Sequence, residues 1–173
     1  ESIGLDKKGM IYLPDEWRLP FLVGFNLFYF AHKKKEAAYF LERASHLPES
    51  PSYLPRLVAR LLYESGETKA ALLFLKGMLQ ETHDPQIREQ LKKRYNALLG
   101  VLVIEEAIQV FRQKYGRYPR SLDELVETRI LREIPVDPYG GVYYWDAGEK
   151  RVKSTSNFHP GIEGKGVLNE SLN

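Results

Sequence analysis

The chain has 173 residues, of which 43% are hydrophobic, so it can bury one good core or two small cores that share an interface. Its 25 Lys and Arg residues against 23 Asp and Glu residues give a net charge of +2, which does not indicate a nucleic-acid partner. It contains no cysteine, which excludes disulfides, thiolate metal sites and cysteine nucleophiles and leaves both cytoplasm and periplasm open.

The first predicted helix covers residues 17–31, which carry apolar side chains on nearly every side, as expected of a helix between neighbours. Its apolar run is interrupted by Pro20 and Gly24 and is shorter than the roughly 20 residues that span a bilayer, so we expect a core helix. Because the chain begins at Glu1 without a Met, we expect that an upstream tag, signal peptide or membrane anchor has been removed. Any membrane contact is expected only through such a segment upstream of Glu1.

Four more helices are predicted in the first hundred residues, at 35–46, 52–66, 68–80 and 86–98. Ser52 is expected to be an N-cap, and Gly66 is expected to end its helix in the left-handed conformation. Asp84 is predicted to be an N-cap that is followed by proline at the first helical position.

Side chains repeat with a period of 34 residues through these helices. The matching pairs are Leu27 and Leu61, Tyr29 and Tyr63, Lys35 and Lys69, Ala37 and Ala71, Phe40 and Phe74, Leu41 and Leu75, and Ala44 and Met78. The sequence therefore resembles the tetratricopeptide repeat (TPR), a helix-turn-helix unit of this period that stacks on its neighbours. The resemblance implies an α-solenoid that binds other proteins. In a third unit the period fades, as in repeats that cap a stack.

In TPR arrays the first helix of each pair lines a concave groove. Aligning the pairs predicts a partner-binding groove formed by Leu22, Asn26, Tyr29, Tyr53, Arg56, Arg60, Tyr63, Gln90 and Arg94. Aromatic side chains interleaved with arginines are favoured in interfaces, and the arginines would donate hydrogen bonds to an acidic or carboxylate-bearing protein or peptide. The alternative is that the tyrosines pack between helices and the arginines form a solvated face. A clamp for a peptide C-terminus is not supported, because Leu57, Ile87 and Leu91 stand where polar groups are needed.

The C-terminal part predicts two helices and a hairpin. Residues 101–115 have an amphipathic helical pattern, and Ser121 with Glu124 predicts a capping box that opens a short helix. Residues 142–145 have the alternating pattern of a strand, and residues 151–154 follow them after a turn, which predicts a β-hairpin.

Several side chains in this part stand in a recognisable order: Phe111, Tyr115, Gly116, Tyr118, Pro119, Leu122, Leu125, Pro135, Asp137, Pro138, Gly140 and Tyr143. This order resembles the periplasmic part of the major pseudopilin of type II secretion systems and related type IV pilin-like proteins. The resemblance implies a small α+β module. The apolar faces of residues 101–115 and 142–145 further predict that the hairpin packs on the helix. Helical repeats replace the family's long hydrophobic segment, so the chain cannot assemble as an ordinary pseudopilin subunit. The family's calcium loop is matched here by residues 156–164, which hold one carboxylate and no Asp, so calcium binding does not carry over.

No catalytic, cofactor or metal site is predicted. The histidines do not take the three- or four-residue spacing of helical metal ligands; they are His32, His46, His83 and His159. The adjacent carboxylates of 105–106 and 123–124 point about 100° apart on a helix and do not share a site. Asp137 is expected to form a turn by bonding backbone amides rather than to act as an acid. Since no GxGxxG, P-loop, GxSxG or HExxH motif occurs, we expect no enzyme and no cofactor.

These patterns predict a mainly α fold, with a TPR-like α-solenoid over 15–99, a pseudopilin-like α+β module over 100–156 and a loosely ordered tail over 157–173. The helix over 101–115 is expected to serve both folded parts. The favoured function is a non-enzymatic scaffold in a bacterial secretion, pilus or envelope-assembly system, at the periplasmic face of a membrane, with the cytoplasm as the alternative location. The alternative function is a structural pilin-like subunit or minor filament component that carries a TPR decoration. A third alternative is an accessory domain of an enzyme.

Overall fold

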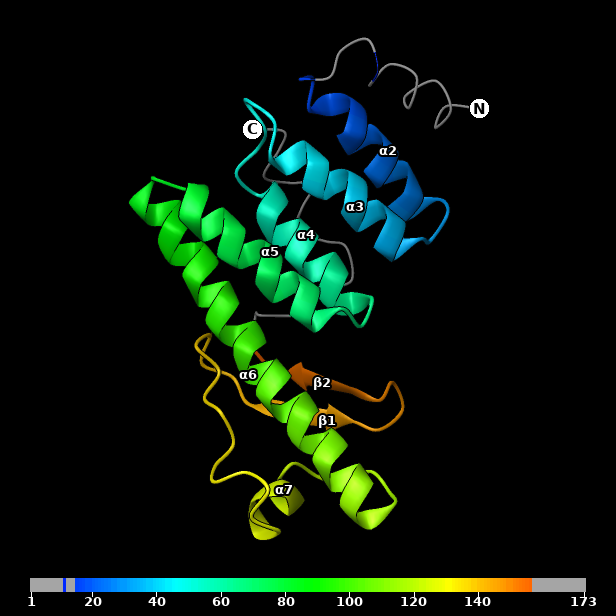
Figure 1. Ribbon diagram of the computed structural model, residues 1–173, viewed down its shortest axis with the longest axis vertical. Coiled ribbons are helices and arrows are strands. Elements are labelled where there is room, and N and C mark those ends of the chain that lie inside the picture. The colour runs from blue at the N-terminus through cyan, green and yellow to red at the C-terminus, as the bar shows by residue number, and fades with distance from the viewer. Residues whose placement is uncertain (1–10, 12–14, 157–173) are drawn as a thin grey trace. The chain divides into compact units, whose positions relative to one another are not determined.

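The computed structural model describes residue 11 and residues 15–156 (Figure 1). Within them the fold is mainly helical, with six helices followed by a two-stranded antiparallel hairpin. The chain divides into two compact units, one that ends at Leu99 and one that begins at Gly100. The predicted tail over 157–173, with His159, lies outside the described residues. Among the residues that are described, no helix is both long and apolar enough to cross a membrane.

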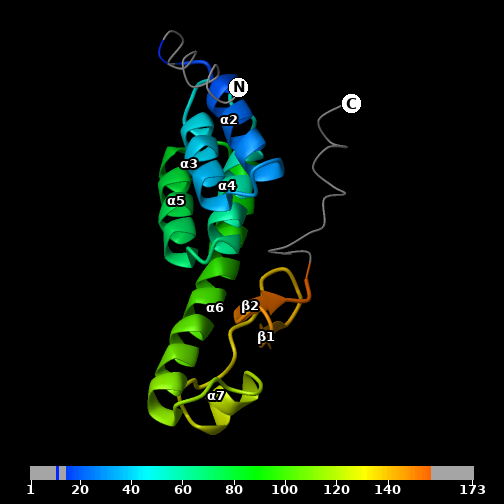
Figure 2. The ribbon, with the colours of Figure 1, turned by 90° about the vertical axis from the view of Figure 1, so that its right-hand side faces the viewer.

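Four helices of the first unit follow one another along the chain: α2 (Arg18–Tyr29), α3 (Lys34–Ser45), α4 (Leu54–Glu64) and α5 (Thr68–Glu81). Each packs on the next, and Figure 2 shows α3 and α5 on one side of this unit, with α2 and α4 on the other. The helices predicted over 17–31, 35–46, 52–66 and 68–80 are confirmed, with ends that differ by one or two residues.

Local capping chemistry decides several helix ends in the first unit. The Asp84 Oδ1 atom accepts hydrogen bonds from the backbone N–H groups of Gln86 and Ile87, at 2.8 and 3.0 Å, which confirms the predicted N-cap. Gly66 has a φ of +81°, the left-handed conformation that was predicted for it. The N-cap predicted at Ser52 is wrong, because Tyr53 occupies that position and makes no side-chain cap.

Two pairs of residues that stand one period apart are buried alike in this unit. Ala37 and Ala71 are both fully buried, as are Leu41 and Leu75. Helix α2 also approaches α3 closely at Gly24, where a Cβ atom would stand 2.6 Å from Cγ of Leu41. The lack of a side chain at this position therefore sets the distance between α2 and α3.

Helix α6 (Pro85–Tyr115) is one continuous helix of 31 residues. The sequence predicts two helices, one that ends at Leu98 and one that starts at Val101, and this break does not form. Gly100 lies inside the helix, where a Cβ atom would stand only 2.8 Å from the Tyr143 hydroxyl oxygen. Glycine in a helix interior costs roughly 0.5–1 kcal/mol relative to alanine, so its presence here is explained by the room that the tyrosine needs.

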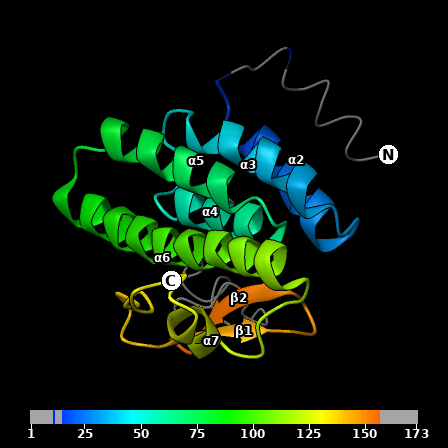
Figure 3. The ribbon, with the colours of Figure 1, turned by 60° about the horizontal axis from the view of Figure 1, so that its bottom comes forward.

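The second unit packs a hairpin beside the C-terminal half of α6, on the same side as the short helix α7 (Figure 3). Strands β1 (Tyr143–Asp146) and β2 (Arg151–Ser154) pair antiparallel, with Tyr143 opposite Ser154. Phe111 of α6 and Tyr143 of β1 are both buried, and the tyrosine ring lies against the α6 backbone. The predicted hairpin and its packing on this helix are therefore confirmed.

Helix α7 (Asp123–Glu127) begins without a side-chain cap. The Glu124 carboxylate accepts hydrogen bonds from the Arg120 backbone N–H at 2.6 Å and from the Arg117 guanidinium at 2.9 and 3.0 Å. The guanidinium first, and the backbone N–H second, lower the pKa of Glu124 to about 2. The capping box predicted at Ser121 is therefore wrong, because the glutamate that would complete it is bound to residues further upstream.

Candidate functional site

The predicted groove residues of α2 lie on one stripe of that helix. Leu22, Asn26 and Tyr29 are spaced by four and then three residues, which places them on one face. Leu22 and Tyr29 are 44% and 43% exposed, and Asn26 is half-buried. Another face of the same helix, which includes Val23 and Leu27, is buried. Between Leu22 and Tyr29, the exposed side chains of α2 are thus apolar.

An aromatic ladder supports the exposed ring of Tyr29. Four rings follow one another at four-residue spacing: Trp17, Phe21, Phe25 and Tyr29. Successive ring centroids lie 5.7, 6.1 and 4.4 Å apart, which are distances of interacting aromatic pairs. A ring that is already held by its neighbours loses little conformational entropy when it contacts a partner.

The predicted groove residues of α4 and of its N-cap position differ in accessibility. Tyr53 and Arg56 are half-buried, and burial raises the pKa of the Tyr53 hydroxyl above its ordinary value. Tyr63 is only 2% exposed and packs inside the helical unit, so it presents no surface to a partner. Its position matches the alternative in which a tyrosine packs between helices.

Arg60 is bound by acidic neighbours within the first unit. Its Nε atom donates to Oε1 of Glu64, one turn later on α4, at 2.7 Å. The Glu64 side chain is nearly buried and also pairs with Nζ of Lys34 at 3.0 Å. Since a carboxylate taken out of water needs such partners, a first role of Arg60 is to neutralise Glu64. Arg56 has no ion-pair partner among the described residues, so it is the arginine of α4 that remains available.

The last two predicted residues lie on the first half of α6. Gln90 is exposed and Arg94 is half-buried, and their four-residue spacing places them on one face. The nine predicted residues therefore form three groups, on α2, on α4 with its N-cap residue Tyr53, and on α6. Tyr63 is the member that burial removes from the surface.

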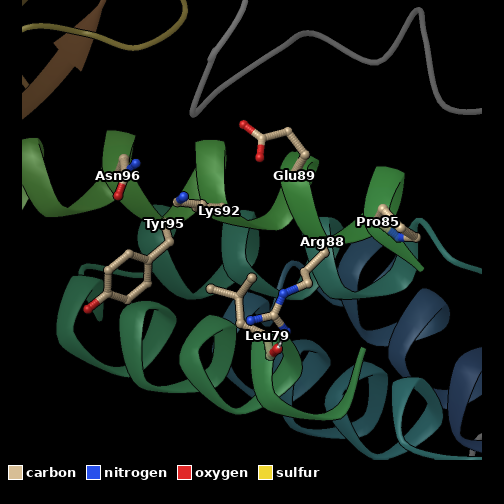
Figure 4. A pocket seen from close by; sticks show the side chains of 7 residues that line it. All are labelled: Leu79, Pro85, Arg88, Glu89, Lys92, Tyr95 and Asn96. Atoms are coloured by element: carbon tan, nitrogen blue, oxygen red, sulfur yellow. Dashed lines mark hydrogen bonds between the residues drawn. The ribbon is translucent and has the colours of Figure 1, made fainter. Parts of the chain in front are cut away.

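A pocket lies on a different face of α6, against the end of α5 (Figure 4). Its volume is about 470 Å³, and its lining residues are Leu79, Pro85, Arg88, Glu89, Lys92, Tyr95 and Asn96. Figure 4 shows Arg88 and Tyr95 extending from α6 toward α5, whereas Glu89 extends away. The Arg88 Nη1 atom donates to the carbonyl oxygens of Leu79 and Thr82, which fixes the guanidinium over the end of α5.

The sequence prediction missed this pocket. A helix turns by about 100° per residue, which places Lys92 about 160° away from both Gln90 and Arg94. The signal was present in the sequence, because Arg88, Lys92 and Tyr95 follow one another at spacings of four and three residues. Aligning the repeats does not reveal it, because the matching α4 positions are core residues.

The second unit contains a buried carboxylate, Asp137. Its Oδ2 atom accepts hydrogen bonds from the hydroxyl groups of Ser154 and Ser156, both at 2.5 Å. Its Oδ1 atom accepts a hydrogen bond from the backbone N–H of Tyr139 at 2.8 Å. The predicted turn is confirmed by this last bond, and the two serines connect the turn to β2 and to the residues that follow it. The cluster therefore joins two separate segments of the second unit.

The described residues do not bring metal ligands together. Within residue 11 and residues 15–156, no group of three His, Asp or Glu side chains is arranged to hold a metal ion. His46 instead faces a single carboxylate, with its Nδ1 atom 3.1 Å from Oε2 of Glu81. No protein family, curated protein or solved structure matches the chain.

Proposed function

We propose that this protein is a non-enzymatic scaffold that binds another protein through its helical unit. In this proposal the unit is a TPR-like stack, in which α2 with α3 and α4 with α5 form consecutive pairs. The proposal is supported by the sequential packing of these helices and by buried alanines and leucines that recur one period apart.

The observation that carries the proposal is the apolar surface of α2, formed by Leu22, Phe25 and Tyr29. Leu22 and Tyr29 are exposed, Phe25 lies partly buried beside them, and the helix packs on α3 through another face at Gly24. An apolar stripe that faces solvent, on a helix that already packs through another face, is best explained by a partner that covers it.

The partner is proposed to combine apolar side chains with an acidic group. Apolar side chains would cover Leu22 and Tyr29, and a carboxylate would pair with Arg56. Arg60 is less suited to this role, because Glu64 already accepts from its Nε atom. Gln90 and Arg94 would provide a further polar contact on α6.

The second unit supports a proposed place in a bacterial secretion, pilus or envelope-assembly system, at the periplasmic face of a membrane. Its helix, the turn at Asp137 and the hairpin follow one another in the order that the pseudopilin resemblance implies. The cluster around Asp137 would stabilise this module without a metal ion.

A second candidate is a structural pilin-like subunit that carries the helical unit as a decoration. It is favoured by Val103 and Val110, which are exposed on α6 within the second unit. Their seven-residue spacing places them on one stripe, the arrangement through which helices of two copies can pack together.

A pair of matched substitutions tests the scaffold proposal. Tyr29→Asp and Tyr39→Asp each place a carboxylate at an exposed tyrosine, the first on the α2 surface and the second on α3. We expect Tyr29→Asp to lose the proteins that cross-link to the tagged chain in envelope fractions, and Tyr39→Asp to retain them. Circular dichroism melting should show that both variants remain folded. Retention of the same cross-linked proteins by both variants would remove the α2 surface from consideration.

A further inference from the structure

We propose that the pocket between α5 and the first half of α6 binds the carboxylate of an acidic peptide segment. This inference rests on the proposed function as a protein-binding scaffold and adds a contact apart from the α2 surface. Arg88 and Lys92 bind the carboxylate, and Leu79 and Tyr95 contact the residue next to it.

The pocket occupies a face of α6 whose counterpart on α4 is core. The residues one period before Arg88, Lys92 and Tyr95 are Leu54, Val58 and Leu61. These three α4 residues are completely buried. The matching α6 residues, Arg88, Lys92 and Tyr95, are polar and are half-buried or exposed. The face that is packed on α4 is therefore a recess on α6. A peptide segment can fill the space that a neighbouring helix fills elsewhere.

The charges in the pocket select an anion. Arg88 and Lys92 are positive, and the one acidic lining residue, Glu89, extends away from the recess (Figure 4). The carbonyl oxygens of Leu79 and Thr82 use one nitrogen of the Arg88 guanidinium, which leaves its other N–H groups available as donors. The Lys92 ammonium makes no ion pair with a carboxylate in the described part of the chain. Both cations are therefore able to bind the same incoming group.

The spacing of the two cations also favours a bound anion. Arg88 and Lys92 stand four residues apart on one helix, where like charges destabilise each other. A polar end of a helical stack needs hydrophilic side chains for solubility, but it does not need two cations on one stripe. A carboxylate between them relieves the repulsion.

The other lining residues favour a peptide over a bare anion. A volume of about 470 Å³ admits a few side chains and is within the usual range for ligand pockets. Leu79, Pro85 and the Tyr95 ring contribute apolar surface, which a small inorganic anion would leave uncovered. The expected occupant is therefore a segment in which Asp or Glu stands beside Leu or an aromatic residue.

The first test titrates the ¹⁵N-labelled full chain with three probes: acetyl-Leu-Asp-Leu-amide, acetyl-Leu-Asn-Leu-amide and inorganic phosphate. Saturable shifts of the Arg88, Lys92 and Tyr95 amide resonances are expected with the Asp peptide. The Asn peptide should bind about tenfold more weakly, because it lacks the charge, and phosphate should bind more weakly than the Asp peptide. The proposal is overturned by an absence of saturable shifts, by equal affinity for the two peptides, or by phosphate binding at least as tightly as the Asp peptide.

The second test uses a matched pair of charge reversals, Lys92→Glu and Lys76→Glu. Both lysines are exposed in the first unit, and Lys76 does not line the pocket. Arg88 is left unchanged, because it caps the end of α5 and its loss would disturb the fold. Lys92→Glu should weaken binding of the Asp peptide by about tenfold or more, whereas Lys76→Glu should change the affinity by no more than about twofold. Equal losses of peptide affinity in the two variants would show that the net charge of the chain attracts the peptide, and would overturn the proposed binding site.

These tests are independent of the α2 surface. The Tyr29→Asp variant should bind the Asp peptide with an affinity within about twofold of that of the unsubstituted chain, because substitutions at separate sites act additively. The pocket is thus overturned by the peptide titrations alone, and the scaffold proposal by the pair of Tyr29 and Tyr39 variants alone.

Discussion

The buried Asp137 cluster of the second unit contrasts with the α2 surface and the Lys92 side chain of the first unit. In the second unit the Asp137 carboxylate is buried and accepts three hydrogen bonds, two of them from serines. In the first unit Leu22 and Tyr29 are exposed, and Lys92 lacks an ion pair within the described chain. Satisfied buried groups stabilise a fold, whereas exposed apolar groups and unpaired charges are available to a partner. In our proposal the Asp137 cluster stabilises the second unit, whereas the α2 surface and the pocket of the first unit bind a partner.

The largest expected effect is at the buried carboxylate. Asp137→Ala removes the acceptor of two hydroxyl groups and one backbone N–H, so the second unit should lose about 3 kcal/mol in its free energy of unfolding. Asp137→Asn keeps the shape and one acceptor oxygen and should lose less than half as much. Urea unfolding followed by tryptophan fluorescence measures both. A loss of under about 0.5 kcal/mol in the alanine variant would mean that this cluster does not hold the unit together.

The helical unit should respond most to changes at its helix contacts. Ala71 is fully buried, so Ala71→Leu should overpack its contact and cost about 1–3 kcal/mol. The matched control is Leu73→Ala on the same helix, where the side chain is 74% exposed and the change should stay within about 0.5 kcal/mol. Thermal unfolding followed by circular dichroism gives both values. Equal effects at the two positions would contradict the packing described for α5.

Two glycine substitutions should change the free energy of unfolding in opposite directions. Gly100→Ala should destabilise the second unit by about 1 kcal/mol or more, because the new Cβ meets the hydroxyl oxygen and ring carbons of Tyr143 at 2.8–3.1 Å. Gly77→Ala in α5 should stabilise the first unit by roughly 0.5–1 kcal/mol, because no atom lies within 4 Å of the new Cβ and alanine favours the helix. Chemical unfolding of the two variants measures the difference. Stabilisation by both substitutions would show that the tyrosine does not need the space at Gly100.

The smallest expected effect is the pH dependence of the ion pair between Arg117 and Glu124. The pKa of Glu124 is lowered to about 2, below the ordinary value of about 4.3. The contribution of this ion pair to the free energy of unfolding is therefore fully present above about pH 4.3 and is lost as the pH falls toward 2. In the Glu124→Gln variant, the free energy of unfolding of the second unit should depend less on pH over this range. Urea unfolding between pH 2 and 6 measures it, and identical slopes in the two proteins would contradict the ion pair.

Local patterns were sufficient to predict most elements of the fold. The helices over 35–46 and 68–80 were predicted from apolar spacing, and the ends at Gly66 and Asp84 from capping chemistry that involves only neighbouring residues. The helix break near Gly100 was wrong because the residue that requires a glycine there, Tyr143, is distant in the sequence. The hairpin was predicted from its alternation, but the serine partners of Asp137 stand 17 and 19 residues away and could not be assigned.

The candidate site could be predicted only in part. Tyr29 and Tyr63 are the same residue at matching repeat positions, yet one is 43% exposed and the other 2%. Repeat alignment cannot supply this difference, because it depends on which helices surround each position. The pocket of Arg88 and Lys92 was missed for a related reason, since its shape depends on how the end of α5 meets α6.

The most direct measurement of the central claim is photo-cross-linking of the full chain in its native cells, with a benzophenone side chain at position 22 or at position 73. Leu22 belongs to the α2 surface, and Leu73 is a more exposed leucine on α5 that lies outside the proposed contacts. If the α2 surface binds a partner, position 22 should give a discrete adduct with one protein, and this adduct should disappear in the Tyr29→Asp background. Position 73 should give no such adduct. An absence of adducts at position 22, or the same adducts at both positions, would contradict a partner-binding role for the helical unit.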